Sequence, residues 1–150
     1  MKGFSVVEII IVIAVGIILV AVIASAFSGF RDSQALNSTV EEVVASINKA
    51  RSESLASKNF LQHGIHFETN QVVVFQGTIY SPSDPNNVET RLSPFIEISS
   101  ISLNGGGADM FFQKFTGKTG QNGTITLRVK KNTAKIKIIT VESTGVISIQ

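Results

Sequence analysis

Glu8 is the residue whose chemistry most needs an explanation, because it lies inside an apolar stretch. It is the only charged residue among the 24 from Phe4 to Phe27. A carboxylate within a membrane-spanning segment costs about 2.5 kcal/mol or more, and such a group usually has a cationic partner. Three cations are candidates: the Lys2 side chain, a new α-amino group on Phe4 if the chain is cut after Gly3, and a group on a neighbouring copy. We therefore expect Glu8 to be charge-paired.

Two histidines and a polar loop carry the other candidate ligands. His63 and His66 lie three residues apart, but the chain has no Cys and no acid at ligand spacing, so we expect no metal site there. The loop over residues 84–89 offers oxygen atoms that calcium favours, although a solvated turn is the simpler interpretation. No nucleophile adjoins a base and no carboxylates are paired in sequence, so we expect neither an enzyme nor a cofactor.

A basic segment near the carboxy terminus is a candidate nucleic-acid surface. Between residues 114 and 137 the chain has seven cations and no acid. Such a cluster can hold DNA phosphates through a salt-dependent attraction. Lysines also protect edge strands against unwanted pairing, and this structural role is the alternative. The residues of the candidate patch are Arg128, Lys130, Lys131, Lys135 and Lys137.

The apolar stretch is long enough to cross a membrane as a helix. Its 24 residues would reach about 36 Å, whereas the hydrocarbon core of a bilayer is about 30 Å thick. By the positive-inside rule the start at Met1-Lys2 stays cytoplasmic and the remainder lies outside the cytoplasm. A secretory signal peptide cleaved at Ala24-Ser25-Ala26 and a plain anchor are the alternatives, and neither accounts for Glu8.

The periodicity then indicates an amphipathic helix and, after Asn59, a series of strands. An apolar stripe at helical spacing continues the helix to about residue 58; its members are Leu36, Val40, Val43, Val44, Ile47, Ala50 and Leu55. Alternating patterns predict strands over 64–68, 72–75 with an extension at 78–80, 95–103, 110–115, 124–131, 134–142 and 146–149. One long helix packed on a mainly antiparallel sheet is an α+β fold.

Gly3-Phe4-Ser5-Val6-Val7-Glu8, followed by the apolar run, resembles the class III signal of type IV pilins and type II secretion pseudopilins. The resemblance implies that a prepilin peptidase cuts after Gly3 and N-methylates Phe4. It also implies that Glu8 pairs with the amino terminus of an adjacent subunit during assembly. On this basis the chain divides into a leader (1–3), a transmembrane and filament-core helix (4–27), an amphipathic continuation (28–58) and a β-rich globular domain (59–150).

Two further segments narrow the resemblance. Residues 47–56 resemble the "ARSEA" stretch of GspH/FimT-type minor pseudopilins, as does the Phe-x-x-x-Gly region within 112–119. This implies β-sheets packed on the carboxy-terminal half of the long helix. It also implies assembly with other pilins on an inner-membrane platform, anchored in membrane lipid.

We predict a minor pilin-like subunit of a type II secretion system or type IV pilus, with its globular domain periplasmic or extracellular. The alternative is a DNA-binding minor pilin for DNA uptake, and a third possibility is an inert single-pass envelope protein. The DNA-binding relatives carry Gly-Arg-x-Arg near the carboxy terminus, whereas here Gly145 is followed by Val146-Ile147-Ser148. This departure counts against the DNA-binding alternative.

Overall fold

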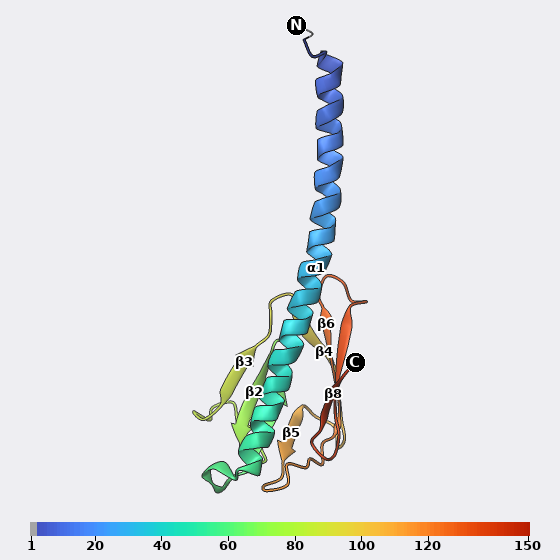
Figure 1. Cartoon of the computed structure of the whole chain (residues 1–150). Helices are drawn as coiled ribbons and strands as arrows, with labels where there is room; N and C mark the ends of the chain where they lie inside the picture. The colour runs from blue at the N-terminus through green and yellow to red at the C-terminus, as the bar shows by residue number, and fades with distance from the viewer. Residues whose placement is uncertain (1–2) are drawn as a thin grey trace. The chain divides into compact units, whose positions relative to one another are not determined.

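The computed structural model describes residues 3–150, apart from the side chains of residues 24–26 and 28. The predictions made for Met1-Lys2 and for the side chains of Ala24-Ser25-Ala26 therefore lie outside the described residues. The chain divides into two compact units, Met1–Gln34 and Ala35–Gln150. Helix α1 (Val6–Leu55) contributes to both units (Figure 1).

The first unit is an apolar helix that begins at a serine cap. Ser5 accepts hydrogen bonds from the backbone N–H of Val7 at its Oγ, at 3.4 Å, and from that of Ile9 at its carbonyl, at 3.2 Å. The stretch Val6–Ile23 has a mean hydropathy of 3.3 and is long and apolar enough to cross a membrane. Its large apolar side chains are 51–73% exposed, so the described part of the chain does not cover them.

The second unit contains two four-stranded antiparallel sheets; the strand periodicity predicts antiparallel strands but not their division between two sheets. The first has the order β3-β2-β1-β5 and the second the order β4-β6-β7-β8. A short 3-10 turn, η1 (Lys58–Phe60), links α1 to β1. The strands are β1 (His63–Phe67), β2 (Gln71–Gln76), β3 (Val88–Arg91), β4 (Ile96–Leu103), β5 (Asp109–Phe112), β6 (Gly123–Val129), β7 (Ile136–Val141) and β8 (Ile147–Ile149).

The core of the second unit lies between the apolar stripe of α1 and the inward faces of both sheets. The buried stripe consists of Leu36, Val40, Val43, Ile47 and Ala50, at alternating steps of four and three residues. Facing residues include Ile65 and Phe67 of the first sheet and Ile125, Leu127 and Ile139 of the second. Figure 1 shows this part of α1 lying alongside the strands. The predicted packing of helix on antiparallel strands is thus confirmed.

Several predicted boundaries are wrong for local reasons. Residues 78–80 do not extend β2, because Gly77 turns the chain away with a φ of 97°. The strand predicted over 110–115 ends at Phe112, and Phe115 has a φ of 64°. Leu55, predicted on the buried stripe, is 38% exposed. Strand β3 is not predicted by the apolar pattern, because its four residues are mostly exposed and show no alternation.

Candidate assembly and binding sites

The amino-terminal site is built around Phe4 and Glu8, four residues apart. The two residues line an open hollow of about 290 Å3 together with Ile9, Val12 and Ile13. Gly3 and Phe4 precede the helix, Phe4 is 80% exposed, and no atom lies within 4 Å of the position that a Cβ at Gly3 would occupy. The Gly3–Phe4 peptide bond is therefore open to another protein.

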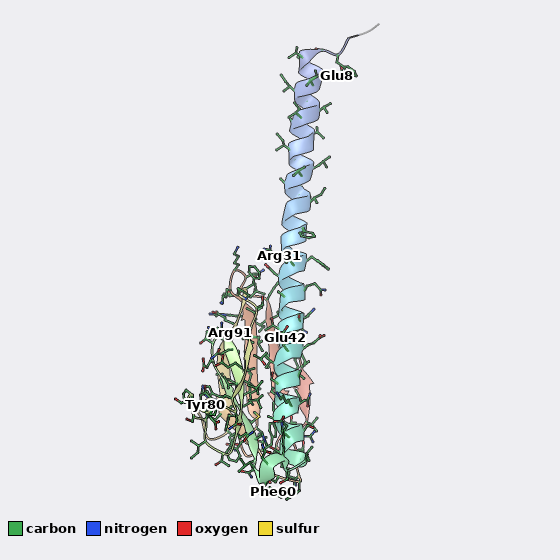
Figure 2. All side chains as sticks on the ribbon, turned by 90° about the vertical axis from the view of Figure 1, so that its left-hand side faces the viewer. Glu8, Arg31, Glu42, Phe60, Tyr80 and Arg91 are labelled. Atoms are coloured by element: carbon green, nitrogen blue, oxygen red, sulfur yellow. The ribbon has the colours of Figure 1, made fainter. Side chains whose placement is uncertain are left out.

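Glu8 has no ion-pair partner among residues 3–150. It is exposed and lies in the first turn of α1, where the helix dipole favours a negative charge (Figure 2). In water the helix dipole and hydration stabilise the charged carboxylate without an ion-pair partner. In an apolar helix bundle, solvation is lost and the carboxylate needs a cation from elsewhere. The site is thus an acid next to an apolar hollow, with the amino-terminal backbone beside it.

The five cations of the predicted nucleic-acid patch do not form one surface. The pairing register of β6 with β7 sets Arg128 against Ile136 and Leu127 against Lys137. Paired residues share a face of a sheet, so Arg128 and Lys137 lie on opposite faces. The Nε of Arg128 also binds the Oε1 of Glu97 on β4 at 2.6 Å, which compensates its charge within the domain.

The remaining three cations lie on the turn between β6 and β7. The Lys135 N–H donates to the Asn132 carbonyl at 3.0 Å, and the Val129 N–H donates to the Lys135 carbonyl at 3.1 Å. The Lys130 ammonium donates to the Pro94 carbonyl at 3.0 Å. The structure therefore brings Lys130, Lys131 and Lys135 to one hairpin turn, a much smaller basic area than the sequence pattern indicates.

The two histidines lie on opposite faces of β1 and do not converge on a metal. His63 is 1% exposed, and its Nε2 lies 3.6 Å from the Oε2 of Glu53. Burial lowers the pKa of His63 below 6.5, and the nearby Glu53 opposes this shift. His66 instead binds the Oδ1 of Asp109 through Nδ1 at 2.5 Å. Among the described residues, no three His, Asp or Glu side chains are placed to hold a metal ion.

In the candidate calcium loop, one carboxylate oxygen of Asp84 is bonded within the turn itself. The Oδ1 of Asp84 accepts hydrogen bonds from the backbone N–H and the side-chain amide of Asn86, both at 2.9 Å. The Nδ2 of Asn87 donates to the Ser81 carbonyl at 2.7 Å. The bond between the Asn86 N–H and Asp84 Oδ1 is that of an Asx turn, in which the carboxylate stabilises the backbone.

An aromatic cluster on the outer face of the first sheet is absent from the sequence analysis. The rings of His66 and Tyr80 stack with centroids 4.0 Å apart, and Phe75 meets Tyr80 at 5.7 Å. Tyr80 follows β2 through a loop, so no strand periodicity connects it with His66. The raised pKa of the Tyr80 hydroxyl comes first from burial and then from the carboxylates of Glu68, Glu89 and Asp109.

An exposed apolar helix followed by an amphipathic segment packed on antiparallel sheets defines a pilin-like protein. Two solved structures share this fold. The type IV minor pilin FimU of Pseudomonas aeruginosa aligns with a TM-score of 0.58 and 15% identity, over 77% of this chain and 92% of that one. The minor pseudopilin EpsH of the Vibrio cholerae type 2 secretion system aligns with a TM-score of 0.56 and 12% identity, over 77% and 95%.

The family described as type II transport protein GspH matches residues 39–145, which is more than two thirds of the chain. The chain therefore belongs to the GspH family. A comparison with curated protein sequences gives no match. The chain is a minor pseudopilin-type subunit, and the solved proteins it resembles are a minor pilin and a minor pseudopilin. None of these comparisons supports the DNA-uptake alternative.

Proposed function

We propose that the chain is a membrane-anchored filament subunit of a type II secretion system or type IV pilus, matured at Gly3-Phe4. A prepilin peptidase cuts after Gly3 and methylates the new amino group of Phe4. The helix over residues 4–27 then holds the subunit in the inner membrane until the assembly platform inserts it into a filament. The amphipathic segment over 28–58 and the β-rich part over 59–150 lie on the far side of the membrane, outside the cytoplasm.

The observation that carries this proposal is the isolation of Glu8. The helix around it is apolar and exposed, and the described residues supply no cation to the carboxylate. A group of this kind in a membrane segment usually has a partner that offsets its desolvation. Cleavage after Gly3 creates a positive charge at Phe4, next to the hollow that Glu8 lines.

The partner of Glu8 is the Phe4 amine of a neighbouring subunit. Within one chain the Phe4 amine lies before the start of the helix, where solvent or lipid headgroups reach it. Between two helices packed side by side, the Glu8 carboxylate and the Phe4 amine are shielded from solvent and from lipid headgroups. The pair then fixes the axial register of the two helices, because an offset leaves both charges unpaired in an apolar environment.

The cleavage step is tested by the intact mass of the protein from cells that contain the cognate peptidase. We expect a chain that begins at Phe4 and carries one additional methyl group. Gly3→Ala should still be cut, since alanine is small, whereas Gly3→Leu should remain at full length. A terminus after Ala26, or an uncut wild-type chain, contradicts the proposed maturation.

The pairing step is tested by comparing Glu8→Val with Glu8→Asp. Valine removes a desolvation cost, so membrane insertion and cleavage should persist, but incorporation into filaments should fall because the neighbouring amine loses its partner. Aspartate keeps the charge with a shorter reach and should assemble in part. The measurement is the ratio of sheared-filament to membrane-resident protein. An equal ratio for wild type and Glu8→Val shows that the carboxylate has no role in assembly.

A further inference from the structure

The turn between β6 and β7 carries three lysines and no acid, and the proposed function does not use it. Lys130 and Lys131 are exposed, and Lys135 is partly buried. The Lys130 N–H donates to the Phe95 carbonyl at 2.9 Å, which brings the loop before β4 alongside the turn. Two large apolar side chains are exposed beside the lysines, Phe95 at 37% and Ile136 at 48%. We call these residues together the basic-turn surface.

The acids at this end of the second unit lie on other surfaces. Glu97 is bonded to Arg128 at 2.6 Å. Three more lie around His66 on the outer face of the first sheet, where Arg91 offsets one of them: Glu68, Glu89 and Asp109. The last two are exposed on α1: Glu41 and Glu42. The second-sheet side of this end is therefore positive, and the first-sheet side is negative.

The length of α1 shows which end of the second unit lies nearer to a bilayer. The apolar stretch ends at Phe27, and the buried stripe of the core begins at Leu36. These residues are about 14 Å apart along a helix, whereas the stripe continues for about 21 Å more to Ala50. The basic turn lies at the Leu36 end of the unit (Figure 1). It therefore lies at the end that reaches lipid headgroups when residues 4–27 span the membrane.

Ammonium groups beside exposed apolar side chains fit the surface of a bilayer that contains anionic lipid. There the ammonium groups meet phosphates, and the apolar side chains enter the headgroup layer. Each lysine near such a surface strengthens binding about fivefold. The phosphates of DNA attract lysines as well, but a duplex offers no apolar layer for Phe95 and Ile136. A bilayer therefore matches this surface better than a nucleic acid does.

We propose that the basic-turn surface binds anionic phospholipid headgroups on the side of the membrane where the second unit lies. The second-sheet side of this end contacts the leaflet, and the acidic outer face of the first sheet is turned away from it. The inference rests on the proposed function, because it takes residues 4–27 to anchor the chain in a membrane. It adds a second lipid contact, made by the globular part, which the subunit gives up when it enters a filament.

Fluorescence quenching on the full-length chain in vesicles tests this contact. The chain has no Cys, so a single introduced cysteine can carry a fluorophore without further changes. Asn132→Cys places the probe on the exposed turn. Thr116→Cys is the control position, because the neighbouring Phe115 N–H donates to the Ser54 carbonyl at the other end of the helical stripe. The vesicles contain phosphatidylcholine, a lipid with a nitroxide on its headgroup, and increasing amounts of phosphatidylglycerol.

We expect quenching at position 132 to rise with the phosphatidylglycerol content and quenching at position 116 to stay constant. The rise should disappear in about 1 M salt, where screening limits the attraction between charges to about 3 Å. Equal quenching at position 132 with and without phosphatidylglycerol, or the same rise at position 116, would overturn the inference.

Two double variants separate the basic turn from the total charge of the chain. Lys130→Gln with Lys131→Gln changes the turn, and Lys114→Gln with Lys118→Gln removes the same charge at the other end. Each pair combines an exposed lysine with one whose ammonium donates to a backbone carbonyl at 3.0 Å.

The two double variants are compared at the lipid composition where half of the wild-type chain is docked. There the first pair should lower the ratio of docked to undocked chain about 25-fold. The second pair should leave this ratio unchanged, and both should keep the unfolding midpoint of the wild type. An equal effect of the two pairs, or no effect of the first, contradicts a contact through the turn.

Two further measurements on the labelled chain separate this inference from its alternatives. Extraction with alkaline carbonate reports on the anchor: a chain that is washed off contradicts both the proposed function and this contact. A chain that stays in the bilayer without the lipid-dependent quenching overturns the contact alone. A short DNA duplex added at physiological salt tests the other source of phosphates. A response of the probe at position 132 to DNA, with none to phosphatidylglycerol, would assign the turn to nucleic acid and overturn the inference.

Discussion

His63 makes the stability of the folded domain dependent on pH. Its imidazole is buried at the start of β1, and burial lowers its pKa below 6.5. Below pH 6.5 the unfolded chain takes up a proton at residue 63 that the folded chain resists. The free energy of unfolding should therefore be fully retained above pH 6.5 and fall as the pH decreases towards the folded pKa, by at most about 1.4 kcal/mol per pH unit. Denaturant unfolding between pH 5 and pH 8 measures this dependence.

The matched variant for this prediction is His63→Leu, which removes the titrating group and keeps the site filled. Its free energy of unfolding should change less than that of the wild type between pH 5 and pH 8. Carboxylates remote from residue 63 contribute equally to both proteins, so the difference between the two curves reports on His63 together with its neighbour Glu53. Parallel curves would show that His63 does not titrate differently in the two states.

Gly64 is required because the ring of Phe75 lies directly over it. A Cβ at Gly64 would lie 2.4 Å from the Cζ of Phe75 and 2.8 Å from the Met110 carbonyl oxygen. Gly64→Ala should lower the free energy of unfolding by about 1–3 kcal/mol, because overpacking displaces the ring and the adjoining strand. Gly120→Ala is the control, since no atom lies within 4 Å of its added Cβ. Equal unfolding midpoints for the two variants contradict the prediction.

Single residues show what the sequence can and cannot predict about a site. The spacing of His63 and His66 along a strand already places them on opposite faces. The partner of Arg128 is different: Glu97 lies 31 residues earlier, and only the pairing of β4 with β6 brings the two together. The charge pattern alone could not reveal that this cation is already neutralised.

At the scale of elements, the junction of α1 with β1 depends on Ser54. This fully buried hydroxyl donates to the His63 carbonyl at 3.1 Å and accepts from the His63 N–H at 2.8 Å. Ser54→Ala should lower the free energy of unfolding by about 1–3 kcal/mol, since two buried backbone groups lose this partner. Ser52→Ala, at an exposed position on the same helix, controls for the change in helix propensity. If Ser54→Ala lowers the free energy of unfolding no more than Ser52→Ala does, water replaces the hydroxyl of Ser54.

Elements with a strong period were predicted well, and elements defined by backbone turns were not. The helical stripe and the strands around Ile65, Val74 and Ile125 follow clear apolar periods. The error at residues 78–80 arises because Gly77 takes a φ of 97°, which an apolar pattern does not encode. Phe115 was placed in a strand because it is apolar, whereas its ring is exposed on a left-handed turn.

At the scale of the whole chain, the division of eight strands into two sheets is what local sequence could not supply. Strand β4 follows β3 along the chain, yet it pairs with β6 in the other sheet. The apolar stripe on α1 packs with the inward residues of both sheets in one core. Periodicity tells which side of each strand is apolar, but not which strand becomes its neighbour.

The core of the second unit predicts that this unit folds without the apolar helix. All the buried residues of the core cluster lie at or after Leu36, and none lies in the first unit. A fragment over residues 29–150 should therefore remain in solution without detergent and should unfold with the same denaturant midpoint as the full chain in micelles. It should no longer bind zwitterionic lipid vesicles, because the stretch Val6–Ile23 is removed.

A fragment over residues 45–150 is the contrast, since it lacks Leu36, Val40 and Val43. Losing three buried apolar side chains, at about 1.5–3 kcal/mol each, removes a free energy comparable with the whole stability of a typical domain, about 5–15 kcal/mol. Cooperative unfolding of 29–150 and none of 45–150 is the expected pair of results, whereas an unfolded 29–150 fragment would show that the apolar helix is needed for the fold itself.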